Sequence, residues 1–354
     1  MKIKITFILP SLSAGGAERV MSFVAQNIDP DKFESTLLIT GSNKGAAYKI
    51  KGINVVFLNS SRVRYSVLSI FKYLKAYKPN IVVSSIAHLN TSLAFISLFF
   101  PKTKFIGREA NVLSVLNQFK KGNNLFNSFL IKISYRLFDS VICLSEDMMA
   151  DLSENFGVPK SKIALINNPI TDDFKVKPIM ENTSNKPMNF ITVASLKKQK
   201  GHLRILSILS KLDYPYTYTL IGNGPQKEAI FNAIETLKLT GEIVHVPFTD
   251  NVSEYLAKSD YFLQGAYVEG FPNCLVESSA VGTPIIAFNA PGGLNEIIEP
   301  GVNGYIANTE EEYLTYLNKQ KKWEPLKVSQ HVKNKFSKEN ILEKYETLFT
   351  QIVK

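Results

Sequence analysis

Asp260–Leu263 reads DYFL, and after a short loop the chain continues with Glu269–Glu277, EGFPNCLVE, and then SSAVG, which ends at Gly282. The first segment is short and apolar, which predicts a buried strand. Pro272 suits the first turn of a helix and Gly282 suits its end, so a helix is expected between them. A strand, a turn and a helix in this order are typical of an α/β fold with a parallel sheet.

The start of this helix is a candidate phosphate site, because N–H groups there lack partners and carry partial positive charge. We expect the segment to bind through its backbone, and it comprises Phe271, Pro272, Asn273, Cys274 and Leu275. Glu277 lies about one turn further in, roughly 6–8 Å along the axis at ~1.5 Å per residue. That is about the distance from a bound diphosphate to a ribose, and Glu269 would lie on the sugar side. The pattern favours a nucleotide-sugar site; in the alternative, both carboxylates are only solvated.

Composition describes a globular protein of more than one domain. The chain has 354 residues, 45% hydrophobic and 20% charged, which suggests two domains. Cys143 and Cys274 offer neither a disulfide framework nor a metal pattern, so a reducing cytosol is expected. The opening MKIKITFILP has too short an apolar run for a signal peptide and favours a first buried strand. Leu89–Phe100 is too short to span a membrane.

The net charge of +10 is unevenly distributed. Residues 1–168 hold 21 Lys and Arg against 10 Asp and Glu, whereas the remainder holds 20 against 21. Nucleic acid is not expected as a partner, since no nucleic-acid-binding signature accompanies the charge. An anionic phospholipid surface or a lipid-diphosphate acceptor fits better. Basic and apolar residues mix in Arg62–Lys78 and Val112–Phe138, as on an interfacial helix, although a core-facing helix or plain solvated lysines explain the same pattern.

Strand-like runs alternate with helical stretches twice along the chain, which predicts two doubly wound α/β domains. Residues 1–168 are expected to form the first domain and 169–337 the second. A last helix is expected over Lys338–Val353. The predicted strands of the first domain are Ile3–Leu9, Glu34–Ile39, Asn54–Leu58, Ile81–Ser84, Lys104–Ile106, Ser140–Leu144 and Lys162–Ile166. Those of the second are Asn189–Ala194, Thr217–Gly222, Ile243–Val246, Tyr261–Leu263, Pro284–Phe288 and Gly304–Ala307.

Two motifs carry a resemblance to a known family. The E-x7-E pair followed by Ala280–Ala287, AVGTPIIA, and the early Gly15–Arg19, GGAER, resemble glycosyltransferase family 4, retaining enzymes of the GT-B fold. The order of motifs matches along nearly the whole chain. The resemblance implies two Rossmann-like domains facing a central cleft: an acceptor domain, residues 1–168, and a nucleotide-sugar domain, residues 169–337. It also implies that helix 338–354 crosses back onto the first domain.

The resemblance assigns further residues to the donor site. Gly16 would contact the diphosphate and Lys200 would face the leaving group. Ser195 stands where the family has Arg, and Lys197 or Lys198 is the candidate to supply that charge instead. Gly222 would turn the chain beside the nucleotide, and the base would lie along an apolar wall formed by Val246 and Phe248. For several of these positions a plain turn, a solvated lysine or core packing explains the same residues.

Two residues of the first half are candidates near the reacting carbon. Glu109 aligns with a position where many family members carry His, so its carboxylate would stabilise developing positive charge or orient an acceptor hydroxyl. A salt bridge to Arg108 is the alternative. His88, after the fourth strand, is a candidate facing the cleft, although a lone His is more often a structural donor.

The sequence therefore predicts a glycosyltransferase that needs no metal or cofactor, since no His, Cys or Asp cluster has metal-ligand spacing and no D-x-D pair appears in a suitable loop. Its donor would be a nucleotide sugar, with UDP-sugar favoured, and its acceptor a hydroxyl of a lipid-linked glycan. It would be cytoplasmic and peripheral at the membrane. The alternatives are a non-catalytic sugar-nucleotide-binding homologue, an epimerase or phosphorylase on the same fold, and a dehydrogenase, which the absence of G-x-G-x-x-G disfavours.

Overall fold

The structure is a computed structural model that describes residues 1–354 except 14, 48, 120–124, 173, 180–185 and 240–241, and except the side chains of 125–128. It divides into two compact units. Unit 1 comprises Met1–Ser114, Lys121–Thr171 and Lys338–Lys354, and unit 2 comprises Val115–Lys120 and Asp172–Ser337. The end of the chain therefore belongs to the same unit as its beginning.

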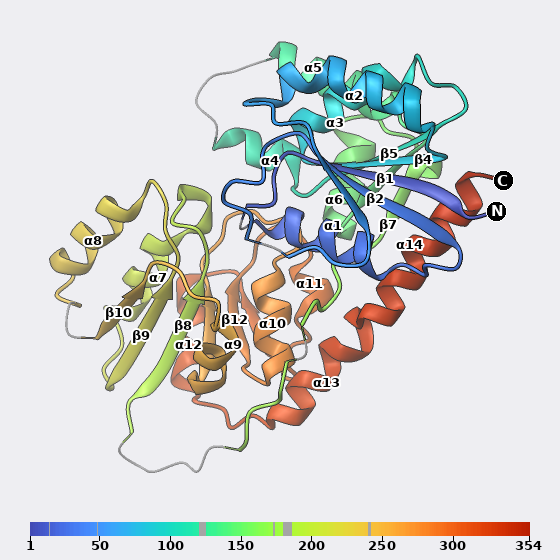
Figure 1. Cartoon of the computed structure of the whole chain (residues 1–354). Helices are drawn as coiled ribbons and strands as arrows, with labels where there is room; N and C mark the ends of the chain where they lie inside the picture. Colours follow the sequence, from blue (N-terminus) through green and yellow to red (C-terminus); the bar gives the residue numbers. More distant parts are fainter. Residues whose placement is uncertain (14, 48, 120–124, 173, 180–185, 240–241) are drawn as a thin grey trace. The chain divides into compact units, whose positions relative to one another are not determined.

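Unit 1 is built on a seven-stranded parallel sheet with the order β3-β2-β1-β4-β5-β6-β7 (Figure 1). The strands are β1 Ile3–Leu9, β2 Phe33–Ile39, β3 Asn54–Phe57, β4 Ile81–Ser85, β5 Lys104–Arg108, β6 Ser140–Cys143 and β7 Ile163–Leu165. Successive residues of β1 are buried from Ile5 to Leu9, as expected for a strand covered on both faces. The strand order reverses between β1 and β4, which is the switch point where doubly wound sheets bind ligands.

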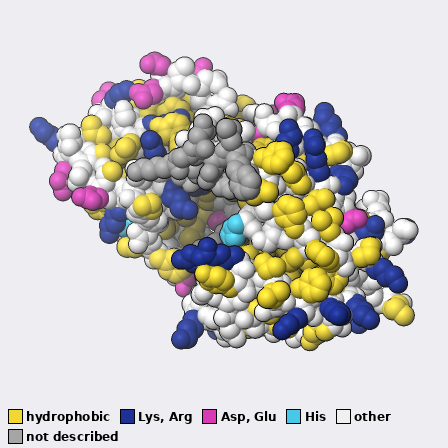
Figure 2. Space-filling view, turned by 90° about the horizontal axis from the view of Figure 1, so that it is seen from above, with side chains coloured by type: hydrophobic (Ala, Val, Ile, Leu, Met, Phe, Trp, Pro, Cys, Tyr) yellow, Lys and Arg dark blue, Asp and Glu magenta, His cyan; other side chains and the backbone are white. Residues whose placement is uncertain are grey.

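Helices pack on this sheet, and the outermost ones expose hydrophobic side chains to solvent (Figure 2). The helices of the first 171 residues are α1 Gly16–Asn27, α2 Val63–Tyr77, α3 Ala87–Ser97, α4 Leu113–Gln118, α5 Leu125–Leu137 and α6 Glu146–Glu154, with a 3₁₀ turn over Lys160–Lys162. The last helix of the unit is α14, Lys338–Ile352.

Helix α14 is anchored to unit 1 by one stripe of side chains. Ile341, Tyr345 and Phe349 are buried at four-residue spacing. The Phe349 ring meets those of Phe7 and Phe33 edge-on, with centroids 6.0 and 6.1 Å apart. This contact joins the C-terminal helix to the first two strands.

Unit 2 repeats the architecture with a six-stranded parallel sheet in the order β10-β9-β8-β11-β12-β13. The strands are β8 Met188–Val193, β9 Tyr216–Ile221, β10 Ile243–Val246, β11 Tyr261–Gln264, β12 Ile285–Phe288 and β13 Gly304–Ala307. The helices are α7 His202–Leu209, α8 Lys227–Thr236, α9 Val252–Lys258, α10 Asn273–Val281, α11 Leu294–Ile297, α12 Glu310–Asn318 and α13 Pro325–Phe336, with a 3₁₀ turn over Lys198–Lys200. Here the order reverses between β8 and β11. The prediction of two doubly wound α/β sheets is confirmed.

Candidate active site

The loops after β8 and β11 meet at the switch point of unit 2. A Cβ on Gly201 would lie 1.8 Å from the carbonyl oxygen of Gly265, and one on Gly265 would lie 2.5 Å from that of Gly201. Only glycine at both positions lets the two backbones touch. The contact brings together the loops that carry Lys200 and Glu269, which are 69 residues apart in the sequence.

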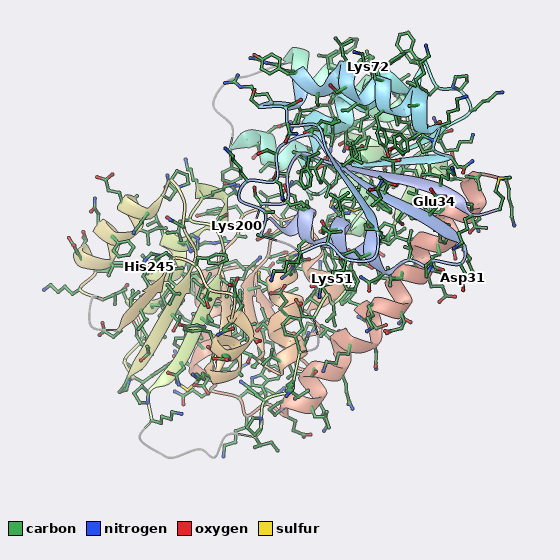
Figure 3. All side chains as sticks on the ribbon, in the orientation of Figure 1. Asp31, Glu34, Lys51, Lys72, Lys200 and His245 are labelled. Carbon is green, nitrogen blue, oxygen red and sulfur yellow. The ribbon has the colours of Figure 1, made fainter. Side chains whose placement is uncertain are left out.

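Lys200 and Glu269 form a bidentate ion pair at this edge of the sheet (Figure 3 labels Lys200). The Lys200 ammonium donates to both carboxylate oxygens of Glu269, at 2.7 and 2.6 Å. Burial is the largest single effect and works to lower the pKa of Lys200, but the charge of Glu269 and its hydrogen bonds act together against it, so the pKa lies above its ordinary value. Lys200 therefore stays protonated near neutral pH.

The backbone of Glu269 is fixed from a third loop. Its N–H donates to the carbonyl of Pro291 at 2.9 Å. A Cβ on Gly292 would lie 2.4 Å from the Glu269 carbonyl oxygen, so the PGG loop packs directly against the glutamate backbone. Glu269 itself is 8% exposed, which leaves only part of its carboxylate accessible.

Helix α10 begins after Pro272, and its first turn differs from the expectation in one respect. Asn273 and Cys274 open the helix as predicted, but the N–H of Leu275 is not free, because it donates to the Pro272 carbonyl at 3.0 Å. The first turn is therefore tightened by this bond, and phosphate binding by Leu275 stays a prediction. The ring of Phe271 is buried and packs edge-on against Phe336 at 5.2 Å, so only its backbone is available to a ligand.

Glu277 lies in the second turn of α10 and is 9% exposed. Cys274, one turn earlier, is surrounded by charged and apolar groups. Burial, together with the charge of Glu269, raises the pKa of the Cys274 thiol to about 12. The thiol therefore stays protonated and is not a nucleophile, and any role of Cys274 belongs to its backbone.

The loops after β8, β9 and β10 place the remaining predicted donor residues. A Cβ on Gly222 would lie 2.0 Å from the carbonyl oxygen of Ala194. The packing of the two loops is therefore enough to require glycine at this position. Val246 accepts from the Gly222 N–H at 2.9 Å. Phe248 is 66% exposed and therefore is not a core residue, which leaves its ring open to a planar ligand.

Ser195 uses its carbonyl within the loop. That oxygen bonds to Nε2 of His202 at 3.1 Å and accepts from the Lys197 N–H at 2.8 Å. Lys197 and Lys198 are exposed, and the substitution of either lysine for the family's arginine stays a prediction.

Arg204 is a residue of this site that sequence reasoning missed. Its guanidinium lies between the rings of Tyr267 and Phe288, 4.3 and 4.0 Å from their centroids. It also donates to the carbonyls of Gly265 and Ala266, on the loop that leads to Glu269. Position 204 lies four residues after Lys200 in the sequence, but no sequence motif indicated a role for it.

In unit 1, Gly16 and His88 lie at the carboxyl ends of β1 and β4, beside the switch point. Gly16 is the first residue of α1 and is exposed. His88 is exposed in the first turn of α3, and partial burial lowers its pKa. The preceding Ile86 has φ 84°, a strained conformation for a β-branched residue.

Glu109 is buried, with 1% exposure, and is held by three donors. The Tyr135 hydroxyl donates to one carboxylate oxygen, and the N–H groups of Ala110 and Asn111 donate to the other at 2.8 and 3.1 Å. Burial raises the pKa of this carboxyl despite these bonds.

The alternative interpretation is a salt bridge between Glu109 and Arg108, and the hydrogen bonds of Arg108 differ from it. The buried guanidinium of Arg108 donates to Ser85 at 3.1 Å and to Asn168 at 2.6 Å instead. Arg108 thus ties together the ends of β4, β5 and β7.

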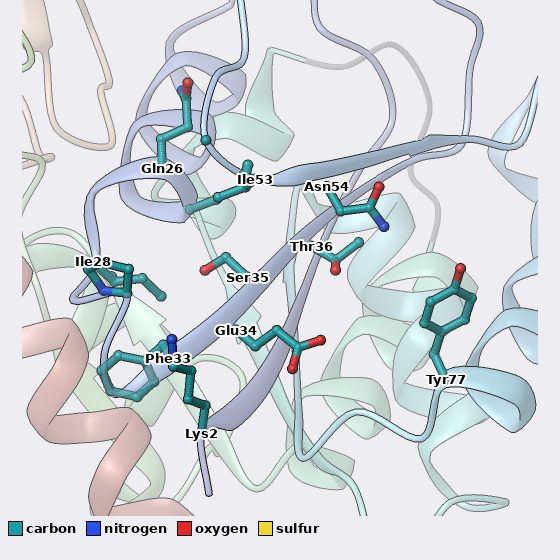
Figure 4. Close-up of a pocket in the computed structure, with 13 residues that line it drawn as sticks. Lys2, Gln26, Ile28, Phe33, Glu34, Ser35, Thr36, Ile53, Asn54 and Tyr77 are labelled. Atoms are coloured by element: carbon teal, nitrogen blue, oxygen red, sulfur yellow. The ribbon is translucent and has the colours of Figure 1, made fainter.

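Unit 1 also has a hollow of about 610 Å³ (Figure 4). Its lining includes Glu34, Ser35 and Thr36 of β2, Asn54 of β3 and Tyr77 at the end of α2. These positions lie at the amino ends of the strands, opposite the edge that binds ligands in such sheets. None of the predicted site residues lines it.

Over the part of the chain that the structure describes, no group of three His, Cys, Asp or Glu side chains is arranged to hold a metal ion. Within the same residues, no helix is both long and apolar enough to cross a membrane.

Comparison with known proteins identifies the class. In solved structures, the fold matches lipopolysaccharide outer core galactosyltransferase WaaB with TM-score 0.79 and 18% identity, covering 99% of this chain and 100% of that one. It matches Anabaena Alr3699/HepE in complex with UDP-glucose with TM-score 0.80 and 18% identity, covering 98% and 100%. The two parallel sheets therefore form a GT-B fold.

The sequence gives the family. The model "Glycosyltransferase Family 4" matches residues 14–174, and "Glycosyl transferases group 1" matches residues 175–334. The chain belongs to glycosyltransferase family 4 and is a glycosyltransferase. A curated relative is the N-acetylgalactosamine-N,N'-diacetylbacillosaminyl-diphospho-undecaprenol 4-alpha-N-acetylgalactosaminyltransferase of Campylobacter jejuni. It is 25% identical over 346 residues, which cover 94% of this chain and 93% of that protein.

Proposed function

We propose that this enzyme transfers a sugar from a UDP-sugar, with retention of anomeric configuration, to a hydroxyl of a lipid-linked glycan at the cytoplasmic face of a membrane. The observation that carries the proposal is the buried Lys200–Glu269 pair at the switch point of unit 2. A cation and a carboxylate held side by side suit a ligand that is a phosphate at one end and a sugar at the other.

In the proposed mechanism, Lys200 stabilises the negative charge that develops on the departing diphosphate. The start of α10, through Asn273 and Cys274, contributes its positive dipole end. Glu269 accepts from donor sugar hydroxyls, and Glu277 accepts from the ribose hydroxyls. Each group then interacts with a different segment of one extended donor.

The uracil base would lie along Val246 and the exposed ring of Phe248, beside Gly222 and Ser195. In the first half, Gly16 would contact the diphosphate and His88 would meet the acceptor. Glu109 is buried by its own partners, so we propose that it positions the loop after β5 rather than touching the substrate. The acceptor hydroxyl attacks from the face that the diphosphate leaves, and the departing phosphate oxygen takes its proton.

The comparisons support the finer assignments without deciding them. The HepE structure is titled as a complex with UDP-glucose, and the Campylobacter jejuni relative is named for a diphospho-undecaprenol acceptor. The excess of cations in residues 1–168 supports a peripheral position at an anionic membrane.

A donor screen tests the proposal. Wild type and Glu277→Ala are compared by thermal shift with UDP-, GDP- and ADP-sugars. A rise in Tm is expected with a UDP-sugar, since a ligand that binds only the folded state stabilises it. The variant is expected to bind about tenfold to a hundredfold more weakly, because a hydrogen bond to a charged group contributes roughly 1.5–3 kcal/mol.

Transfer is then followed with the bound donor and lipid-linked glycan extract, and the anomeric proton of the product is identified by NMR. Binding without transfer would support the non-catalytic alternative. A product of inverted configuration would contradict the retaining mechanism.

A further inference from the structure

One region of unit 1 carries cations almost without carboxylates. Residues 35–138, most of which belong to unit 1, contain fifteen Lys and Arg, of which Arg108 is buried, but a single acidic residue, Glu109. That glutamate is 1% exposed, so its charge does not reach the surface. Lysines that merely keep a protein soluble are normally mixed with acids, so this pattern indicates a surface made for an anionic partner.

Large hydrophobic side chains are exposed in the same region, on helices α2 and α3. Leu68 of α2 is 75% exposed, and the exposed stripe of that helix continues through Arg64, Lys72 and Lys75 at helical spacing. The Leu68 side chain therefore lies among exposed cations, which are placed to bind lipid headgroups.

Helix α3 supplies the larger apolar area. Leu98 and Phe99, at its C-terminal end, are 62% and 69% exposed, and Phe95 is 37% exposed. Phe71 of α2 packs edge-on against Phe99 at 5.8 Å, which joins the two helices. We call Leu68, Phe95, Leu98 and Phe99 the apolar ridge. Figure 2 shows hydrophobic side chains gathered on this face with Lys and Arg between and around them.

The combination of apolar and cationic side chains at the apolar ridge favours one class of partner. A second copy meeting ridge to ridge would bring cations against cations, which opposes association. Nucleic acid would use the charges but would leave four large apolar side chains without a contact. An anionic bilayer satisfies both, because acyl chains receive the apolar side chains and headgroups receive the cations.

The exposed stripe of α3 also includes His88, the candidate site residue of this helix. His88 in the first turn and Phe95 in the last turn lie on the exposed side of α3, and Phe99 follows just beyond its end. From His88 to Phe95 is roughly 10 Å along the axis at ~1.5 Å per residue. A ridge seated in lipid would therefore hold the His88 end of α3 near the headgroups, where the sugar of a lipid-linked acceptor lies.

We propose that the apolar ridge of α2 and α3 inserts into the surface of an anionic phospholipid bilayer, with the surrounding lysines and arginines bound to the headgroups. Its part in presenting the acceptor rests on the function proposed above, whereas the binding to lipid does not.

Vesicle flotation of the full chain tests the insertion. Wild type is expected to float with vesicles of phosphatidylglycerol and phosphatidylcholine and to be released from them at high salt, where screening shortens the reach of charges. It should bind vesicles of phosphatidylcholine alone at least tenfold more weakly. The double variant Leu98→Ser/Phe99→Ser and the variant Lys72→Glu should each lose at least fivefold in partitioning.

Matched controls lie in unit 2. Leu326 is 57% exposed on α13, and Lys258 is exposed at the end of α9. Leu326→Ser and Lys258→Glu should partition as wild type does. All variants should keep the wild-type Tm and the wild-type thermal shift with UDP, which shows that they are folded.

Quenching by brominated lipid supplies a direct measure of insertion. The only tryptophan of the chain, Trp323, lies in unit 2, so wild-type fluorescence should be unaffected by brominated vesicles. Phe99→Trp should add a quenched signal. Equal partitioning of ridge and control variants, equal binding to neutral vesicles, or an unquenched Trp at position 99 would overturn the proposal. Vesicle binding that persists while no sugar is transferred would refute the proposed function and leave this inference standing.

Discussion

At the scale of single residues, the charge of the site is concentrated in one pair. Lys200 donates to both oxygens of Glu269, so each oxygen has only part of its acceptor capacity left for a sugar hydroxyl while the pair is intact. A diphosphate carries more negative charge than the carboxylate, so we expect it to draw Lys200 toward itself and release Glu269. Binding of the phosphates would then prepare the carboxylate for the sugar.

Breaking the pair from one side is expected to destabilise unit 2 as well as to stop transfer. Lys200→Met leaves a buried carboxylate unpaired, which costs about 3–5 kcal/mol. The double variant Lys200→Met/Glu269→Gln should recover much of that loss, because it leaves no buried charge. Transfer should fall by about 10²–10³-fold in Lys200→Met and in the double variant, since both remove one stabilising group from the leaving diphosphate. The single variant Glu269→Gln completes the comparison.

Calorimetry measures the change in the stability of the variants, and the rate of UDP release measures the change in transfer. If the losses of stability in the single variants simply add in the double variant, the pair is not energetically coupled.

The cation at the diphosphate also bears on metal dependence. Because Lys200 would neutralise the leaving group, we expect EDTA to change the transfer rate by less than about twofold. Steady-state rates with EDTA, and with EDTA followed by added Mg²⁺, measure this. A loss restored by Mg²⁺ would show that a divalent ion shares the role of Lys200.

At the scale of elements, the site depends on the loops at the carboxyl ends of the strands. The loops after β8 and β11 touch at Gly201 and Gly265, and Arg204 of α7 donates a hydrogen bond to the Gly265 carbonyl of the second loop. Helix α10 then begins where the loop ends. The position of Glu269 is thus set by backbone packing as much as by its own side chain.

Replacing Arg204 should loosen the loop that carries Glu269. Arg204→Met removes two hydrogen bonds and the stacking on Tyr267 and Phe288, and we expect Tm to fall by roughly 5–10 °C, from about 2–3 kcal/mol. Since the contacts of Arg204 are with the loop that carries Glu269, Arg204→Lys should recover part of both Tm and kcat.

Arg64 is the matched control, because its guanidinium also lies over a ring, that of Tyr65 at 4.8 Å, but at an exposed site. Arg64→Met should leave Tm within about 1–2 °C. Equal effects at the two positions would mean that Arg204 has no special role in the loop.

At the scale of the whole molecule, two units of the same architecture share one chain that ends in the unit where it began. Helix α14 returns to the strands of unit 1 through Phe349, and Glu346 accepts from the N–H of Asp29 at 2.9 Å. The stability of unit 1 therefore depends on the last residues of the sequence.

Phe349→Ala should destabilise unit 1 by about 3–5 kcal/mol, the usual loss for a buried phenylalanine. Far-UV circular dichroism follows the unfolding of both units, while Trp323 fluorescence reports unit 2 alone. The circular dichroism signal of unit 1 should therefore shift, and the Trp323 transition should not. Leu326→Ala, at an exposed position, is the control. A common shift of both signals would show that the units unfold as one.

Local patterns sufficed for much of this protein. The strands of both sheets were predicted within a few residues, because each is a short apolar run between turn signals. Helix α10 was predicted from Pro272 and Gly282. Helices α3, α12 and α13 were not predicted, although Thr309 caps α12 with Glu312 three residues later and Pro325 opens α13.

The sequence by itself determined the two doubly wound sheets and the family, and it indicated Lys200, Glu269 and Glu277 as candidate site residues, since periodicity and motif spacing are local properties. Only the tertiary structure decided that Lys200 is paired with Glu269, that Arg204 holds their loop and that Glu109 is buried against Tyr135. It also decided which hydrophobic side chains of α2 and α3 remain exposed. These facts depend on contacts between residues far apart in the chain, where packing and desolvation act, and no sequence window contains both partners.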